Sequence, residues 1–267
     1  MDDADGGKGG AILLGGGSLT MTGCAVINNT SSADYRVSGI YTEGGGIYAT
    51  AGSRLIITGS SISNNESSAH YSGWGGGIAG ENATMTIRDS QLSGNIGYYE
   101  GGAISWSGGS LTIENCAITN NSEYPHTGEG YGGALLIHNT DVLVARSTIA
   151  DNYANYGGAI FSSSSQITIT ESTIANNAAL GGAVLEDWGD SALIIRNSTI
   201  TGNVGYYAIG TFDLYLANSI VAGNSNRGPD INGTITSLRR RLFEGVLALS
   251  TASCCCRATR RLLAVGL

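Results

Sequence analysis

The chain repeats one stretch along most of its length: Leu111-Thr112-Ile113-Glu114-Asn115-Cys116-Ala117-Ile118-Thr119-Asn120-Asn121. Its skeleton is L-x-[IL]-x-x-[CS]-x-[ILV]-x-x-N, and a second element, Gly-Gly-[AI]-[ILV], lies between most consecutive copies. Three of the seven spacings between copies are 25 or 26 residues, and the longer ones contain longer loops after the Asn. The copies end at eight asparagines, Asn29, Asn65, Asn95, Asn121, Asn152, Asn177, Asn203 and Asn224. A repeat of this length, kept over most of a chain, is typical of a solenoid.

Within each copy apolar residues alternate with polar ones, as they do in β-strands. In the quoted copy Leu111 and Ile113 face one side, and Cys116 and Ile118 face that same side. The step of three between Ile113 and Cys116 breaks the alternation, so we expect two short strands that meet at a corner. A small Cys or Ser fits such a bend. The Gly pair and the apolar residues after it predict a third strand, so one repeat reads as strand, corner, strand, turn, strand.

Three short strands per repeat, with no helix-forming segment, predict an all-β fold: a parallel β-helix of about eight coils. Equivalent strands of successive coils then pair in parallel at roughly 4.8 Å per coil. The asparagines suit this arrangement, because Asn tolerates a left-handed backbone and its amide can bond to the Asn above and below. The leucine-rich repeat is the alternative. Its Asn lies inside L-x-L-x-x-N-x-L, where this chain has Cys or Ser, so we favour the β-helix.

These repeats resemble those of polymorphic outer-membrane-protein-like surface proteins. The resemblance rests on Gly-Gly-Ala-Ile, as in Gly101 to Ile104, and on Ile-x-x-Asn, as in Ile118 to Asn121. Those right-handed parallel β-helices carry GGA[ILV] and FxxN, and here Ile, Leu or Val replaces the Phe. Residues 218–237 also resemble the end of the repeat region in bacterial β-helix proteins that continue into a cell-surface anchor. The resemblance covers about residues 9–237 and implies an extracellular or cell-surface location, but it does not imply one activity.

The charge of the chain is unevenly spread. Residues 1–237 hold seven Lys or Arg and 20 Asp or Glu, a net charge of −13, whereas residues 238–267 hold six Arg and one Glu, a net charge of +5. The repeat also ends at this boundary. We therefore predict a β-helix domain over 1–237 and an aberrant or disordered basic tail over 238–267, with a genuine basic tail as the alternative. The acidity of the repeat region argues against nucleic acid as a partner.

The sequence shows no secretory leader and no membrane-spanning segment, so we expect a fragment of a longer exported protein. Cys24 and Cys116 take the same corner in different coils, too far apart for a disulfide, and are expected to be small buried residues. The Cys254-Cys255-Cys256 run lacks the spacing of a metal site. We expect no cofactor and no metal.

Aromatic residues gather in one kind of loop. Eleven of the 13 Tyr lie between a repeat Asn and the next Gly pair, and Trp74 joins them. Since these loops share one edge of the stack, we expect a row made by Trp74, Tyr99, Tyr131, Tyr156 and Tyr206. Aromatic faces along a groove suit the apolar faces of sugar rings, although each ring could instead merely cover its own turn. The glycan-binding candidates are Trp74, Tyr98, Tyr99, Tyr131, Tyr156, Tyr206 and Tyr207.

Acidic residues share this edge, and Glu43, Glu100 and Glu129 are the candidates for acid or base chemistry. Paired carboxylates can act as general acid and base on a glycosidic bond, or hold Ca²⁺ for a lyase. However, Arg36 is the single basic residue of these loops, and Asp-rich and calcium-repeat motifs are absent, so we favour solvated loop acids. Three isolated side chains are expected to be structural only: Trp106, His138 and Trp188.

The leading hypothesis is a non-catalytic, cell-surface or secreted β-helix segment that binds polysaccharide or a host or cell-surface glycan, as an adhesin does. The first alternative is a polysaccharide lyase, hydrolase or epimerase. The second is a passive structural spacer.

Overall fold

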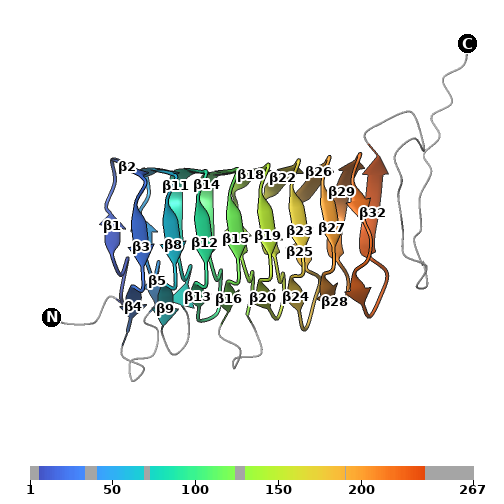
Figure 1. Cartoon of the computed structure of the whole chain (residues 1–267), viewed down its shortest axis with the longest axis horizontal. Coiled ribbons are helices and arrows are strands. Elements are labelled where there is room, and N and C mark those ends of the chain that lie inside the picture. The colour runs from blue at the N-terminus through green and yellow to red at the C-terminus, as the bar shows by residue number, and fades with distance from the viewer. Residues whose placement is uncertain (1–5, 34–40, 69–72, 124–129, 190, 238–267) are drawn as a thin grey trace, which may run out of the picture.

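The computed structural model describes residues 6–33, 41–68, 73–123, 130–189 and 191–237. Within these ranges every helix or strand assigned is a β-strand, and the strand pairs run parallel. Equivalent strands lie side by side along the long axis of the molecule (Figure 1). These features confirm the predicted all-β parallel β-helix. The tail at 238–267 and Glu129 lie outside the described residues.

Three long sheets run along the stack. Sheet 1 has 14 strands and takes the strand after each Gly pair together with the L-x-[IL] strand: β1 (Ile12–Leu14), β2 (Ser18–Thr22), β6 (Ile47–Ala49), β7 (Arg54–Thr58), β11 (Ile78–Arg88), β14 (Ile104–Glu114), β17 (Leu135–His138), β18 (Asp141–Ala145), β21 (Ile160–Ser163), β22 (Gln166–Thr170), β25 (Leu185–Trp188), β26 (Ala192–Arg196), β29 (Ile209–Ala217) and β32 (Ile231–Ser237).

Sheet 2 has eight strands, one from each coil, and follows the corner: β3 (Ala25–Ile27), β8 (Ser61–Ser63), β12 (Gln91–Ser93), β15 (Ala117–Thr119), β19 (Thr148–Ala150), β23 (Thr173–Ala175), β27 (Thr199–Thr201) and β30 (Ile220–Val221). Sheet 3 has eight strands and follows the repeat Asn: β4 (Thr30–Ser32), β9 (Glu66–Ser68), β13 (Ile96–Gly97), β16 (Ser122–Glu123), β20 (Tyr153–Ala154), β24 (Ala178–Ala179), β28 (Val204–Gly205) and β31 (Ser225–Asn226). A separate pair joins β5 (Thr42–Glu43) to β10 (Gly73–Trp74).

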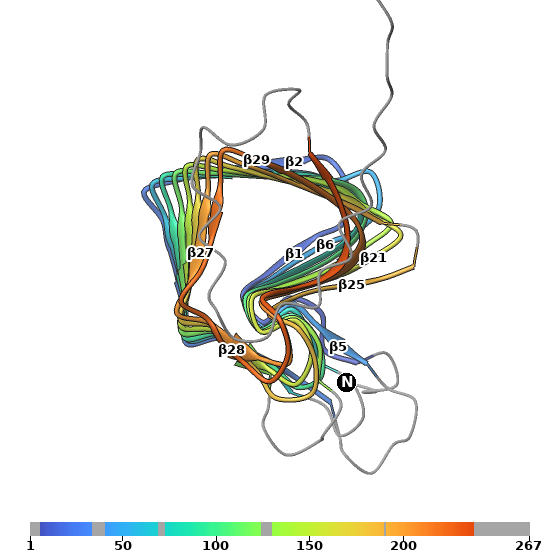
Figure 2. The ribbon, with the colours of Figure 1, turned by 90° about the vertical axis from the view of Figure 1, so that its right-hand side faces the viewer.

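Sheet 3 corrects the predicted repeat, which had a turn after the Asn. Its strands are only two or three residues long, so no apolar alternation marks them in the sequence. They form because the backbone of each coil continues to pair with its neighbours beyond the Asn. Viewed along the axis, the coils superpose, and sheet 1 is bent into two sides, one bearing β2 and β29 and the other bearing β6, β21 and β25 (Figure 2).

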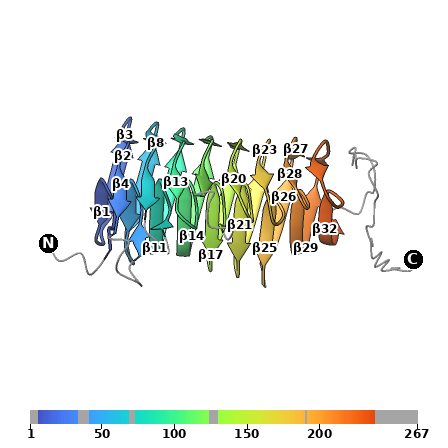
Figure 3. The ribbon, with the colours of Figure 1, turned by 90° about the horizontal axis from the view of Figure 1, so that it is seen from below.

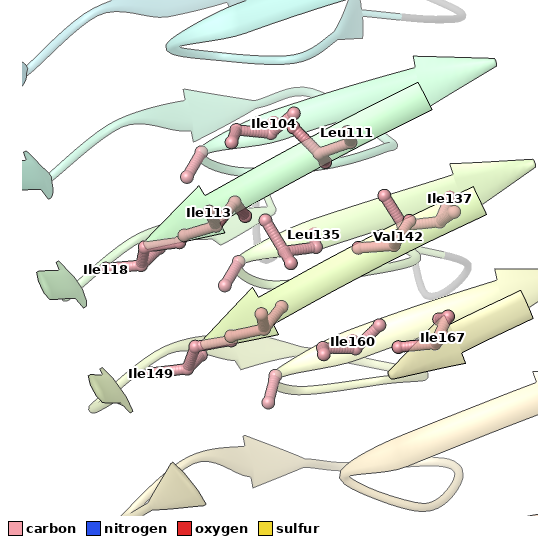
Figure 4. Close-up of a cluster of buried hydrophobic side chains, with 14 of the residues drawn as sticks. Ile104, Leu111, Ile113, Ile118, Leu135, Ile137, Val142, Ile149, Ile160 and Ile167 are labelled. Atoms are coloured by element: carbon pink, nitrogen blue, oxygen red, sulfur yellow. The ribbon is translucent and has the colours of Figure 1, made fainter. Parts of the chain in front are cut away.

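In the core, equivalent apolar side chains of successive coils stack on one another. Ile104, Leu135 and Ile160 occupy one register position in β14, β17 and β21, and their side chains lie inside the coil (Figure 4). Each is 2% exposed or less. Burying such a side chain contributes about 1.5 to 3 kcal/mol, and the column repeats this gain at every coil.

The repeat asparagines form a continuous hydrogen-bonded ladder. Each Oδ1 accepts bonds from the backbone N–H and the Nδ2 of the Asn in the preceding coil, as Asn121 does from Asn95 at 3.0 and 2.9 Å. The Nδ2 of Asn121 also donates to Leu92 O. The side-chain bonds link, in order, Asn29, Asn65, Asn95, Asn121, Asn152, Asn177, Asn203 and Asn224. The buried amides are thereby satisfied in the interior of the ladder.

We expected the repeat asparagines themselves to adopt a left-handed backbone conformation, and this prediction is wrong by one position. The residue before each ladder Asn, not the ladder Asn itself, has a positive φ, for example Asn64 at 54° and Asn120 at 57°. A left-handed residue turns the chain sharply between sheets 2 and 3, and Asn, Asp and Gly tolerate that conformation best. The ladder Asn is therefore required for its side chain.

The corner before sheet 2 has a ladder of its own. The Oγ of Ser147 accepts the backbone N–H of Cys116 at 3.1 Å and donates to Ala145 O at 2.8 Å. Ser172 repeats both bonds one coil further on. A corner Ser is therefore a hydrogen-bonding residue as well as a small one. Cys116 is buried as expected, but Cys24 is exposed, because few of the described residues cover it in the first coil.

Replacing Asn121 by Ala should lower the free energy of unfolding by about 2 to 4 kcal/mol, because it leaves buried partners in two neighbouring coils without a bond. The same change at Asn29, which ends the described ladder and is only half-buried, is the matched control and should cost about 1 kcal/mol. Urea denaturation followed by circular dichroism measures both. Equal losses would contradict a cooperative ladder.

One interior column places a glycine next to a large aromatic residue. Gly80, Trp106 and Ile137 share a register position in neighbouring coils, and the Trp106 ring is 1% exposed. A β-carbon at Gly80 would overlap this ring. The column thus accommodates one indole by omitting the side chain beneath it.

We expect Gly80→Ala to lower the free energy of unfolding by about 1 to 3 kcal/mol, through overpacking against Trp106. The double variant Gly80→Ala, Trp106→Leu should lose less than the sum of the two single changes, because the smaller Leu leaves room for the methyl group. Additive losses in thermal unfolding would show that the two positions do not share this space.

Candidate functional site

A groove of about 320 Å³ lies on the outer face of sheet 1. Its floor is formed by strands β14, β17, β21 and β25, which lie side by side (Figure 3). Along these strands, side chains alternate between the core and this outer face. Ile104, Leu135 and Ile160 point inward, so the residues that follow them, Ser105, Leu136 and Phe161, face the groove.

A second outward row lies two residues further along the same strands. Strand pairing aligns Ser107, His138, Ser163 and Trp188 in four successive coils. His138 Nδ1 and Ser163 Oγ are 2.5 Å apart and share a hydrogen bond. All four residues line the groove, so its floor changes from polar to aromatic along the stack.

The facing wall is a row from the loops before the Gly pairs. Isolated parallel bridges join Trp74 to Glu100, Glu100 to Tyr131, and Tyr131 to Tyr156. The predicted row had Tyr99 in place of Glu100, and this is wrong by one residue, because the loop at 98–100 brings the carboxylate rather than the phenol into register. Trp74, Glu100 and Tyr131 line the groove, and Tyr156 supports Tyr131 from the next coil.

Four aromatic rings meet at one end of the groove. The centroid of the Tyr131 ring lies 5.4 Å from Tyr156, 4.7 Å from Phe161 and 5.7 Å from Trp188. The Tyr pair is stacked, whereas Trp188 meets its neighbours edge on. Trp188 remains 46% exposed, and its Nε1 donates to Glu186 Oε1 at 3.1 Å. The cluster therefore offers an oriented and exposed indole.

Glu100 is the carboxylic acid of the groove lining. Burial raises the pKa of this carboxyl to about 7, and no neighbouring charge offsets that rise. A carboxyl with such a pKa holds a proton at neutral pH about half of the time, which suits both hydrogen bonding and proton transfer.

The other predicted site residues lie elsewhere. The rings of Tyr98 and Tyr99 pack on each other with centroids 5.3 Å apart, outside the groove lining. Tyr206 lies beneath the Arg227 guanidinium, whose carbon is 4.9 Å from the ring centroid, and Tyr207 follows it in the last complete coil. Glu43 occupies the loop row two coils before Glu100 and forms an ion pair with Lys8.

A comparison with known protein families decides the classification of the chain. A family model described as a right-handed β-helix region matches residues 75–226. The chain belongs to this right-handed β-helix family. The match spans the groove from Glu100 to Trp188. Comparisons with curated proteins and with solved structures give no significant match.

Sequence reasoning missed the strand floor of this β-helix groove. His138 and Trp188 were expected to be structural only, and Phe161 was not singled out. Their signal is positional, since each lies one or three residues after an inward apolar residue that follows a Gly pair. This offset becomes informative once the strand after the Gly pair is known to bear an outward face.

The described residues also bear on metal binding and on membrane insertion. They contain no group of three or more His, Cys, Asp or Glu side chains placed to hold a metal ion. Nor do they contain a helix that is long and apolar enough to span a membrane.

Glu123 is a second unusual carboxyl, close to the groove wall but buried at 3% exposure. Its Oε1 accepts the backbone N–H of Asn155 at 2.9 Å, while Oε2 has no hydrogen-bond partner among the described residues. Burial raises its pKa to about 7, and the bond from Asn155 only partly opposes this rise. Gly130 permits the arrangement, because a β-carbon there would overlap the carboxylate.

The raised pKa of Glu123 predicts a pH-dependent stability. A carboxyl whose pKa rises from 4.5 to about 7 on folding binds its proton more tightly when folded, so the stability falls as pH rises through this window. The full loss is about 3 kcal/mol. Glu123→Gln should therefore be more stable than the parent chain at about pH 8 and similar to it at about pH 5.

Urea denaturation at the two pH values measures this difference. Glu171→Gln, which removes a carboxylate from an exposed corner, is the control variant. A Glu123→Gln profile parallel to that of the parent chain would exclude Glu123 as the titrating group.

Proposed function

We propose that this right-handed β-helix is a non-catalytic binding segment that holds a glycan in the groove. The observation that carries the proposal is the aromatic cluster of Tyr131, Tyr156, Phe161 and Trp188 at the end of the groove. Pyranose rings present apolar faces that pack on aromatic rings, and their hydroxyls need nearby polar groups. Ser107, His138 and Ser163 supply such groups along the floor.

The proposed location is the cell surface or the extracellular space, in an adhesin-like role. The resemblance to polymorphic outer-membrane-protein-like repeats supports this location. The molecule is a rod of stacked coils (Figure 1), and its groove lies on the side of the rod across several coils. A groove of this orientation suits a linear polymer lying across several coils.

The second candidate is a carbohydrate-active enzyme, namely a lyase, hydrolase or epimerase. It is favoured by Glu100, whose pKa of about 7 suits a general acid that donates a proton to a glycosidic oxygen. Glycosidases of the usual type need a second carboxylate beside the bond, and the described groove lining supplies one carboxylate. Binding without turnover is therefore the better-supported function.

Affinity electrophoresis of the full chain through gels that contain single polysaccharides tests the proposal. Retarded migration without clearing of the polymer is expected for at least one of them. Tyr131→Ala and Trp188→Ala should each weaken the affinity about tenfold, the equivalent of one lost stacking contact. Tyr207→Ala, outside the groove, is the matched control and should migrate as the parent chain does.

Other outcomes identify the alternatives. Clearing of the polymer around the band, lost in Glu100→Gln, would establish the enzyme. Unretarded migration through every polysaccharide, for the parent chain and for all variants, would leave a spacer and would refute glycan binding.

A further inference from the structure

The carboxylates on the groove side of the molecule differ in their partners. Glu43 has Lys8 Nζ at 3.3 Å, and Glu186 accepts the backbone N–H of Ala183 and the indole N–H of Trp188. Glu100 differs from both, because its side chain has no hydrogen bond or ion pair with any residue in the described part of the chain. It is an acidic group with its partner position open to the groove.

Aromatic residues flank Glu100 in the loop row. The loop row places Trp74 in the preceding coil and Tyr131 in the following one, each at a spacing of roughly 4.8 Å. A carboxylate between aromatic rings is the arrangement that binds an ammonium group, since ring faces and carboxylate both attract positive charge.

The protein contains an occupied version of this arrangement. Two coils earlier in the same row, the ammonium group of Lys8 lies 3.3 Å from Glu43 and 5.2 Å from the centroid of the Tyr48 ring. There the chain itself supplies a cation to a carboxylate and a ring on the same face. At Glu100 the carboxylate and the rings recur, but the described groove lining contains no Lys or Arg.

The surrounding sequence offers no lysine or arginine as a substitute. The segments 69–72 and 124–129, which interrupt the loops before Trp74 and Tyr131, contain no Lys or Arg. Residues 1–237 carry a net charge of −13, a balance that attracts cations and repels polyanions. The raised pKa of Glu100 agrees with an unoccupied partner position, since a bound ammonium group would lower it.

We propose that the groove selects a glycan whose sugars carry free amino groups, with one ammonium group bound to Glu100 between Trp74 and Tyr131. The neighbouring sugar ring then packs on Trp188. The proposal rests on the proposed glycan-binding function and specifies its ligand class. It excludes uronate-rich polysaccharides, which would place their own carboxylates against Glu100.

The test compares two oligosaccharides that differ at the C2 nitrogen, which is a free ammonium group in one and a neutral acetamide in the other. Isothermal titration calorimetry measures the affinity of the full chain, just below neutral pH, for a glucosamine hexamer and for the corresponding N-acetylglucosamine hexamer. The amine form should bind at least tenfold more tightly, and added salt should weaken its binding much more than that of the acetylated form.

The variant Glu100→Gln should abolish this preference without loss of the fold, which circular dichroism checks. Glu171→Gln removes the same charge from an exposed corner outside the groove lining, and it should keep the preference. This comparison separates a site at Glu100 from the general attraction of an acidic protein for a polycation. Trp188→Ala should weaken both hexamers to a similar degree.

Three results overturn the proposal in distinguishable ways. Equal binding of both hexamers, unchanged in Glu100→Gln, would refute the amine site and leave glycan binding intact. Absence of binding to either hexamer and to every polysaccharide in the gels would refute the proposed function itself. An amine preference that Glu100→Gln and Glu171→Gln reduce equally would assign it to net charge and would also refute the site.

Discussion

In-register parallel pairing between successive coils is the constraint on which this structure depends. Each strand pairs with its equivalents on both sides, so every residue lies against the residue at the same position one repeat away. Residues of the same type therefore often lie next to one another in successive coils. Stacked Ile residues fill the core, stacked Asn residues form a ladder of amide hydrogen bonds, and stacked Ser residues form a second hydrogen-bonded ladder at the corner.

The same constraint concentrates chemistry outside the core. A register position that faces outward becomes a row, and two strand rows together with one loop row enclose the groove. The rows differ from coil to coil, since outward residues are free of the packing that holds the interior constant. Serine, histidine and tryptophan thus succeed one another along a single row, and function can vary within a fixed frame.

The fold was predictable because the same pattern occurs in eight copies, as in the spacing of Leu111, Cys116 and Asn121. Sheet 3 was not, since strands such as β13 carry no alternating apolar residues and exist through backbone pairing alone. In the site, Trp74 and Tyr131 were placed correctly along one edge, but Tyr99 was expected where Glu100 lies. Loop register depends on a single residue, which the periodic pattern does not fix. Phe161 and Trp188 escaped notice because they lie on a strand rather than in the loops.

The Asn ladder also bears on how such a chain can evolve. Its units are joined by bonds that are the same at every step, so a duplicated unit of 25 or 26 residues would join the ladder at either side without altering any bond pattern. A whole-repeat duplication would lengthen the groove by roughly 4.8 Å and add one new position to each row. A single-residue insertion inside a strand would instead shift every later side chain to the opposite face. Genetic variation in this protein is therefore expected in whole repeats and in the loops, where length is free.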